Sequence, residues 1–186
     1  LEQDVVVGED CLIHANVVVA HGCEIGSRVI LKSGCVIGME GFGFAQDEKG
    51  RSHRIPQTGR VVIEDDVLMG SQCNVDRAAW GETRIGAGSK FDALCHVAHN
   101  AEIGEDCIIV AQTGVAGSSS LGKRVVVSGQ CAITDHVKIT DDVTLALDQA
   151  AANLKAYGHE LSEKPRAREL RQRWKSLTHD YEAMLP

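Results

Sequence analysis

An aliphatic or aromatic residue recurs at every sixth position over most of this 186-residue chain. The pattern covers residues 1–37, resumes at residues 63–75 and continues, after a shift of four residues, over residues 85–145. Glycine often follows the repeat residue, where its freedom of backbone conformation suits a bend. Neither the helical period of 3.6 nor the strand period of 2 explains this spacing over such a length. A repeat of fixed period predicts a solenoid.

Six residues are enough for one short strand and a turn, with the aliphatic side chain pointing inward. Twenty-one repeat positions, at three strands per coil, predict about seven coils. The pattern resembles the hexapeptide-repeat, left-handed parallel β-helix, a known exception to right-handed crossover connections. A β-sandwich of short strands is the alternative, but it has no reason to stay in phase over eleven consecutive repeats. We therefore expect an all-β solenoid.

Interruptions of the repeat define the expected domain organisation. Residues 1–145 form the β-helix domain, with an excursion at residues 39–60 that is too long to be a tight turn and a shorter excursion at residues 76–84. The repeat decays after this domain, and apolar residues beyond Pro165 keep helical spacing. Residues 146–186 are therefore expected to form a C-terminal, mainly helical extension.

Composition limits the classes of function. A net charge of -7 argues against a general nucleic-acid binder, for which a basic surface is expected. No apolar run approaches the roughly 18 residues of a membrane span, and we find no secretory signal. Each of the seven cysteines lies four residues after a repeat residue. Since free cysteine packs like a small apolar residue, this spacing favours reduced, structural thiols in a cytoplasmic protein over disulfides or a metal site.

Two of the eight histidines stand out by their position in the repeat. His99 and His136 follow repeat residues that are 36 positions apart, so they are expected on one edge of the solenoid, two coils and on the order of 10 Å apart. Gly117 lies 18 residues after His99 and is expected between them. An imidazole can act as a general base near neutral pH, and a glycine amide beside it can stabilise an oxyanion. A metal site using His96 and His99 is the weaker interpretation, because the two side chains point differently in a strand and turn.

Four short motifs, in order, resemble the UDP-3-O-acylglucosamine N-acyltransferase family of lipid A biosynthesis. They are GFGF at residues 41–44, IPQTGRV at residues 55–61, VDR at residues 75–77 and AHN at residues 98–100. The resemblance covers about residues 1–139 and begins at Leu1, so we expect either a fragment or a chain without the family's N-terminal uridine-binding domain.

This resemblance implies acyl transfer from acyl carrier protein to the 2-amine of a UDP-linked, O-acylated glucosamine, with a 3-hydroxyacyl chain as the group moved. It implies that His99 is the general base, Gly117 the oxyanion amide, Asp92 an acidic catalytic residue and His136 a second active-site histidine. Further candidate substrate-binding residues are Asn100, Phe42 and Phe44. The resemblance also implies a homotrimer with active sites between subunits and no metal or nucleotide cofactor, since phosphopantetheine arrives on the carrier protein.

The chain departs from the family pattern at Ala93, where the family commonly has asparagine, and at Asp135, where it has glycine. Two other functions therefore stay open: a hexapeptide-repeat transferase that uses acyl-CoA on a different sugar, and a catalytically weak scaffold. Six basic residues between Lys164 and Lys175 suggest a docking surface for an acidic carrier protein, with Arg168, Arg171 and Lys175 as its candidate residues.

Overall fold

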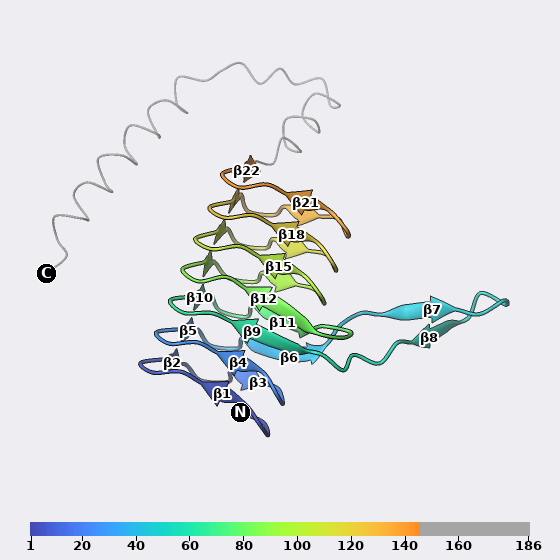
Figure 1. Cartoon of the computed structure of the whole chain (residues 1–186), viewed down its shortest axis with the longest axis horizontal. Coiled ribbons are helices and arrows are strands. Elements are labelled where there is room, and N and C mark those ends of the chain that lie inside the picture. The colour runs from blue at the N-terminus through green and yellow to red at the C-terminus, as the bar shows by residue number, and fades with distance from the viewer. Residues whose placement is uncertain (146–186) are drawn as a thin grey trace, which may run out of the picture. The chain divides into compact units, whose positions relative to one another are not determined.

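The computed structural model describes residues 1–145 as a stack of β-helical coils (Figure 1). Each coil gives one short strand to each of three parallel sheets, and corresponding residues of neighbouring coils pair directly, as His96 does with Gly114. The predicted left-handed parallel β-helix is confirmed. The predicted helical extension at residues 146–186 lies outside the described residues.

The three sheets take successive strands of the chain in turn. The first sheet contains β1 (Val6–Val7), β4 (Glu24–Ile25), β9 (Arg60–Ile63), β12 (Glu82–Ile85), β15 (Glu102–Ile103), β18 (Ser120–Leu121) and β21 (Lys138–Ile139). The second contains β2 (Leu12–Ile13), β5 (Ile30–Leu31), β10 (Leu68–Met69), β13 (Lys90–Phe91), β16 (Ile108–Ile109), β19 (Val126–Val127) and β22 (Thr144–Leu145). The third contains β3 (Val18–Val19), β6 (Val36–Glu40), β11 (Asn74–Arg77), β14 (His96–Val97), β17 (Gly114–Val115) and β20 (Ala132–Ile133).

The residues of the six-residue repeat form the core of the β-helix. Leu31, Ile85 and Phe91 are among the largest fully buried side chains. The residue before each repeat position points outward, because successive side chains of a strand face opposite sides of the sheet. In β16, for example, Ile109 is 1% exposed whereas Ile108 is 48% exposed. The core is therefore one continuous column of aliphatic side chains along the axis.

The corners of the coils require left-handed backbone. Along the upper coils a residue with φ between 54° and 74° recurs at every sixth position, from Gly88 to Asp142. Such a conformation costs a non-glycine residue roughly 1–2 kcal/mol, yet Leu94, Asn100 and His136 all adopt it. Backbone hydrogen bonds between adjacent coils hold these corners, as when the amide of His136 donates to the Gly117 carbonyl at 3.2 Å.

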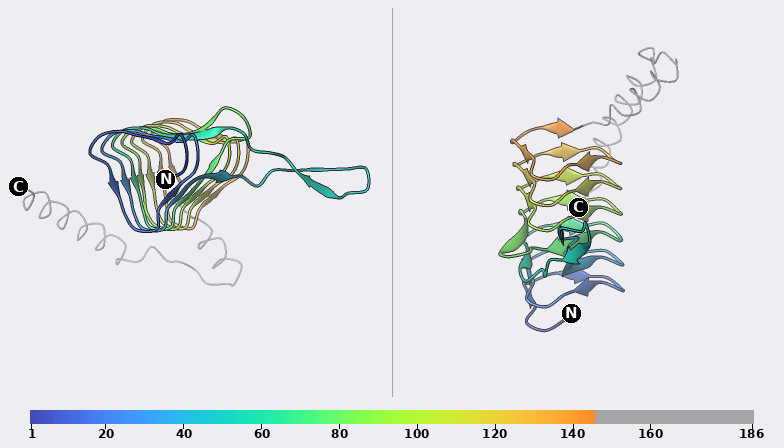
Figure 2. Two further views of the ribbon diagram at one scale, coloured as in Figure 1. Left: turned by 90° about the horizontal axis from the view of Figure 1, so that it is seen from below. Right: turned by 90° about the vertical axis from the view of Figure 1, so that its right-hand side faces the viewer.

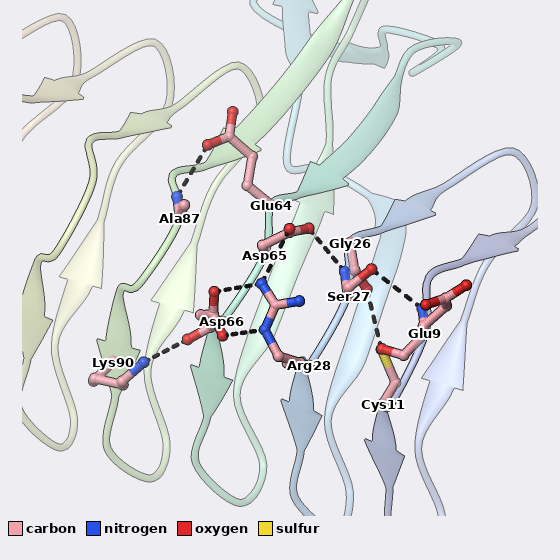
Figure 3. Close-up of polar contacts among 10 residues, drawn as sticks. All are labelled: Glu9, Cys11, Gly26, Ser27, Arg28, Glu64, Asp65, Asp66, Ala87 and Lys90. Atoms are coloured by element: carbon pink, nitrogen blue, oxygen red, sulfur yellow. Dashed lines mark hydrogen bonds and ion pairs between the residues drawn. The ribbon is translucent and has the colours of Figure 1, made fainter.

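One edge of the β-helix, between the first and second sheets, carries a network of polar contacts across coils (Figure 3). The Asp65 carboxylate accepts a hydrogen bond of 2.8 Å from the Ser27 amide, and Arg28 pairs with both Asp65 and Asp66. Lys90 contacts the Asp66 carbonyl from the next coil. These groups are exposed, and water screens such pairs. The buried column therefore contributes more to stability than this edge, which mainly caps corner amides.

Both excursions leave the β-helix at the third sheet. The first contains an antiparallel hairpin of β7 (Phe44–Gln46) and β8 (Ser52–Arg54), which projects away from the coils in Figures 1 and 2. The sequence predicted only a loop here, because the hairpin lacks the alternating apolar pattern of a half-buried strand pair. The second excursion connects β11 to β12, and its carbonyls accept hydrogen bonds from the returning end of the first, including Gly59 to Ala78 at 2.9 Å.

Arg77 joins the two excursions from inside. Arg77 is only 3% exposed. Its guanidinium donates hydrogen bonds to the carbonyls of Gly38 at 2.6 Å, Gly59 at 3.0 Å and His21 at 3.0 Å. Gly38 precedes the first excursion and Gly59 lies at its end. A single buried guanidinium therefore closes the neck of that excursion and ties it to the coil below.

The seven cysteines are all free thiols, as the spacing predicted. Five are buried, and several donate their S–H to a carbonyl of the next coil, as Cys35 does to Gly70 at 3.0 Å. Burial raises the pKa of the Cys107 thiol, in keeping with an inert packing role. Within residues 1–145, no helix has the length and apolar character needed to cross a bilayer.

Two adjacent isoleucines test the inward and outward assignment. Ile109→Ala is expected to lower the free energy of unfolding by roughly 2–5 kcal/mol, because it leaves a cavity in the column. Ile108→Ala removes the same atoms from the outer face and is expected to cost less than about 1 kcal/mol. Urea denaturation of both variants at one protein concentration measures the difference, and equal losses would contradict the assignment.

Candidate active site

A pocket of about 480 Å³ lies on the outside of the third sheet, at its edge with the first sheet. It runs across three coils, from β14 upward, and the first excursion forms part of its wall. Most of its surface is apolar and made of small side chains, with imidazoles and one carboxylate at the margins. The lining residues are Phe42, His96, Ala98, His99, Gly114, Val115, Ala116, Gly117, Ala132, Ile133, Asp135 and His136.

His99 lies between two glycines. A Cβ atom added to Gly117, one coil above, would be 2.9 Å from both Cε1 and Nε2 of the His99 ring. A Cβ added to Gly41, on the first excursion, would be 2.8 Å from the His99 Cβ. Real Cβ atoms essentially never approach so closely, so both positions must lack a side chain for the ring to stay where it is. The stacking of His99 and Gly117 was predicted from their spacing, whereas the contact with Gly41 was not.

Asn100 determines which ring nitrogen of His99 carries the proton. The Asn100 side chain accepts a hydrogen bond from the Ala79 amide at 2.9 Å through Oδ1 and donates one to the Trp80 carbonyl at 2.9 Å through Nδ2, which fixes its orientation. The same Oδ1 lies 3.2 Å from Nδ1 of His99. Since that oxygen only accepts, Nδ1 must be protonated in the neutral ring. The lone pair then lies on Nε2, beside Gly117.

The amide of Gly117 has no hydrogen-bond partner within residues 1–145. At another edge, the carboxylate of Asp141 caps the equivalent amide of Lys123 at 2.9 Å from one coil above. Asp135 occupies the corresponding position above Gly117, but no such bond forms. A glycine whose amide is free therefore packs beside the His99 ring, and the spacing predicted such a glycine as an oxyanion donor.

The structure brings His136 and Phe42 into the same pocket as His99. His136 lies at a left-handed corner two coils above His99, with its side chain exposed. Phe42 is 85% exposed and contacts Phe44, with ring centroids 4.9 Å apart. Phe44 is outside the pocket lining, so it supports Phe42. An exposed aromatic pair at the mouth of an apolar pocket is suited to binding a ligand.

Two other predicted site residues, Asp92 and Asn100, do not line the pocket. Asp92 follows β13 of the second sheet, so it lies at a different edge of the β-helix from His99 and does not reach the pocket within one chain. Asn100 turns its amide toward the second excursion instead of the pocket, and its Oδ1 faces the His99 ring. The candidate docking residues Arg168, Arg171 and Lys175 lie outside the described residues.

A cluster of three polar side chains at the lower end of the pocket, Asn74, Asp76 and His96, was missed from the sequence. Asp76 is 5% exposed, accepts a hydrogen bond of 2.7 Å from Asn74, and lies 3.5 Å from Nε2 of His96. Asp76 belongs to the VDR motif at residues 75–77, which contributed only to the family resemblance. A single aspartate before an excursion does not indicate burial. Residues 1–145 contain no group of three or more histidine, cysteine or acidic side chains that could hold a metal ion.

Comparisons with known proteins agree with the family resemblance that the four sequence motifs indicated. The family model described as bacterial transferase hexapeptide (six repeats) matches residues 4–38 and 82–117. A UDP-3-O-acylglucosamine N-acyltransferase from Methylococcus capsulatus is 51% identical over 114 residues, which are 61% of this chain and 32% of that protein. The enzyme of the same name from Wolinella succinogenes is 46% identical over 137 residues, 74% of this chain and 43% of that protein. The chain thus spans less than half the length of these curated relatives.

Solved structures support the fold. The structure of LpxA from Acinetobacter baumannii matches with a TM-score of 0.67 and 24% identity, covering 77% of this chain and 54% of that one. A UDP-N-acetylglucosamine acyltransferase from Bacteroides fragilis matches with a TM-score of 0.62 and 20% identity, covering 87% and 76%. The resemblance to the UDP-3-O-acylglucosamine N-acyltransferases that was predicted from the sequence is confirmed over the β-helix.

Replacement of Asn100 tests the assignment of the His99 tautomer. In Asn100→Ala the ring loses the acceptor that holds the proton on Nδ1, so we expect the ¹⁵N NMR signals of His99 to shift toward the other tautomer at high pH. His14, which is remote from the pocket, should keep its signals. Unchanged His99 signals in the variant would show that another group orients the ring.

Proposed function

Because the β-helix of this chain is similar to UDP-3-O-acylglucosamine N-acyltransferases, we propose that it transfers an acyl group from a thioester to the amine of an acylated UDP-glucosamine. The observation that carries this proposal is the close packing of the His99 ring on Gly117, where an added Cβ would be 2.9 Å from Nε2 and where the amide is free. A base and an oxyanion donor on the same side of one pocket are the two groups that acyl transfer to an amine requires.

In the proposed mechanism, the neutral amine attacks the thioester carbonyl as Nε2 of His99 takes one of its protons. The carbonyl oxygen becomes an oxyanion, which accepts a hydrogen bond from the Gly117 amide. Collapse of this intermediate breaks the C–S bond, and the imidazolium of His99 returns the proton to the thiolate. Asn100 holds Nδ1–H throughout, so the ring presents the same nitrogen for both proton transfers.

The donor and the assembly are parts of the same proposal. We expect the donor to be a 3-hydroxyacyl chain on the phosphopantetheine of acyl carrier protein, in the cytoplasm, with no metal or nucleotide cofactor. The small side chains Gly114 and Ala132 leave a groove on the third sheet in which such an arm can lie. Asp92 is exposed on another edge, so only a second copy of the chain can bring it to His99. This separation supports active sites between subunits, and we expect the assembly to be a homotrimer.

Transfer assays with two donors test the function. With UDP-3-O-acylglucosamine as acceptor, we expect turnover with 3-hydroxyacyl carrier protein and little with acetyl-CoA. His99→Gln should lower the rate on the order of 10²–10⁴-fold, because the general base is lost. His136→Ala should lower the rate less, since its side chain lies at the far end of the pocket.

The assay also separates the alternatives. A preference for acetyl-CoA and a different sugar would replace the proposed substrates with those of another hexapeptide-repeat transferase. The absence of turnover with every donor, from a chain whose thermal unfolding remains cooperative, would instead favour a scaffold. Turnover in His99→Gln within a few fold of the unchanged protein would place the base elsewhere.

A further inference from the structure

We propose that the buried carboxylate of Asp76 is the counter-charge for the imidazolium that forms on His99 when it takes the proton. The catalytic part of this inference rests on the proposed function. The electrostatic coupling between Asp76 and His99 can be tested without any turnover. It concerns a residue of the third sheet that lies beneath the pocket and does not line it.

The register of the coils places Asp76 below His99. Val75 pairs with Val97, so Asp76 lies one coil below Ala98, about 4.8 Å away along the axis, and His99 is the next residue. Asp76 also pairs with Met39 of β6, two residues before the glycine that packs on His99. The first excursion therefore lies beside both the carboxylate and the imidazole, and Asp76 is 5% exposed.

The hydrogen bonds around Asp76 favour its ionised form. Nδ2 of Asn74 donates to one carboxylate oxygen at 2.7 Å, and it also lies 3.1 Å from Nδ1 of His96. Since that amide nitrogen can only donate, Nδ1 of His96 is the acceptor, and the neutral ring carries its proton on Nε2. This N–H faces the second oxygen of Asp76 at 3.5 Å. Both oxygens thus face donors, while neither donor carries a full charge.

A buried negative charge without a full positive partner attracts a proton to the nearest available base. His96 lies nearer to Asp76, but its Nδ1 accepts the Asn74 hydrogen bond and its Nε2 already carries the proton that faces the carboxylate. His99 is the next base, and its Nε2 is free. Burial raises the pKa of Asp76, and the nearby His96 and His99 and the Asn74 hydrogen bond oppose that rise. The other titratable groups that line the pocket are Asp135 and His136, both on the far side of Gly117.

The ionised carboxylate of Asp76 lowers the free energy of unfolding. This effect distinguishes a role in catalysis from a role in stabilising the fold. Because its pKa is higher in the folded chain than in the unfolded chain, ionised Asp76 lowers the free energy of unfolding as the pH rises through the two pKa values. Asp76→Asn removes this effect, but its amide NH2 would face one of the two N–H donors that the carboxylate faces, which offsets the gain. We therefore expect a thermal midpoint at neutral pH close to that of the unchanged protein.

The decisive measurement is the pKa of His99 by NMR titration, with its signal assigned from the spectrum of His99→Gln. We expect Asp76→Asn to lower this pKa by about one unit, the order expected for the loss of an opposite charge nearby. Asp76→Ser is the second uncharged variant if the first does not fold. Asp10→Asn, an exposed corner residue in the first coil, is the matched control and should leave the pKa unchanged.

In Asp76→Asn, the acid limb of the pH profile of kcat/KM should move to lower pH by the same amount as the His99 pKa. A His99 pKa within about 0.2 units of the unchanged protein, or above it, would overturn the inference. If the unchanged protein does not transfer acyl groups at all, the proposed function fails, but the titration still decides the charge coupling. If it transfers normally and the His99 pKa is unmoved, only the inference about Asp76 fails.

Discussion

Every feature of the pocket depends on the hydrogen bonds that pair equivalent residues of successive coils. Because the coils are parallel and in register, a residue at one position always lies over the same position of the coil below, as Gly114 lies over His96. The spacing between coils is then the spacing of strands, about 4.8 Å. That distance brings the ring of His99 into contact with the glycine above it. A slip of one residue would turn every core side chain outward.

The site is formed where this regular structure is interrupted. Each excursion leaves after a strand of the third sheet and returns at a strand of the first sheet. The core register is kept up to that point, since Val75 pairs with Ile37 below it and Val97 above, and it shifts by one residue only at Asp76. The first excursion supplies the glycine that packs on His99 and the exposed Phe42, and the second is held by the amide of Asn100. The buried Arg77 keeps both in place from below. The coils thus position the base, and the excursions orient it.

The part of the site that could be predicted is the part that follows from periodicity. A constant 18-residue coil places His99, Gly117 and His136 on one edge with no knowledge of side-chain packing. The hairpin, the orientation of Asn100 and the burial of Asp76 depend on how the excursions fold back. No repeat constrains those segments, so sequence spacing carries no information about them. The edge on which Asp92 lies also follows from the repeat, because Phe91 and Val97 are successive repeat residues and belong to successive sheets. The resemblance alone carried no such information.

The central claim is that contact between His99 and an unsubstituted Gly117 makes the site competent. The most direct measurement is the acyl-transfer rate of Gly117→Ala, whose added methyl group would overlap the imidazole. We predict a loss of roughly 10²-fold or more with cooperative unfolding retained, because both the ring and the oxyanion amide would be displaced. A rate within a few fold of the unchanged protein would contradict the account.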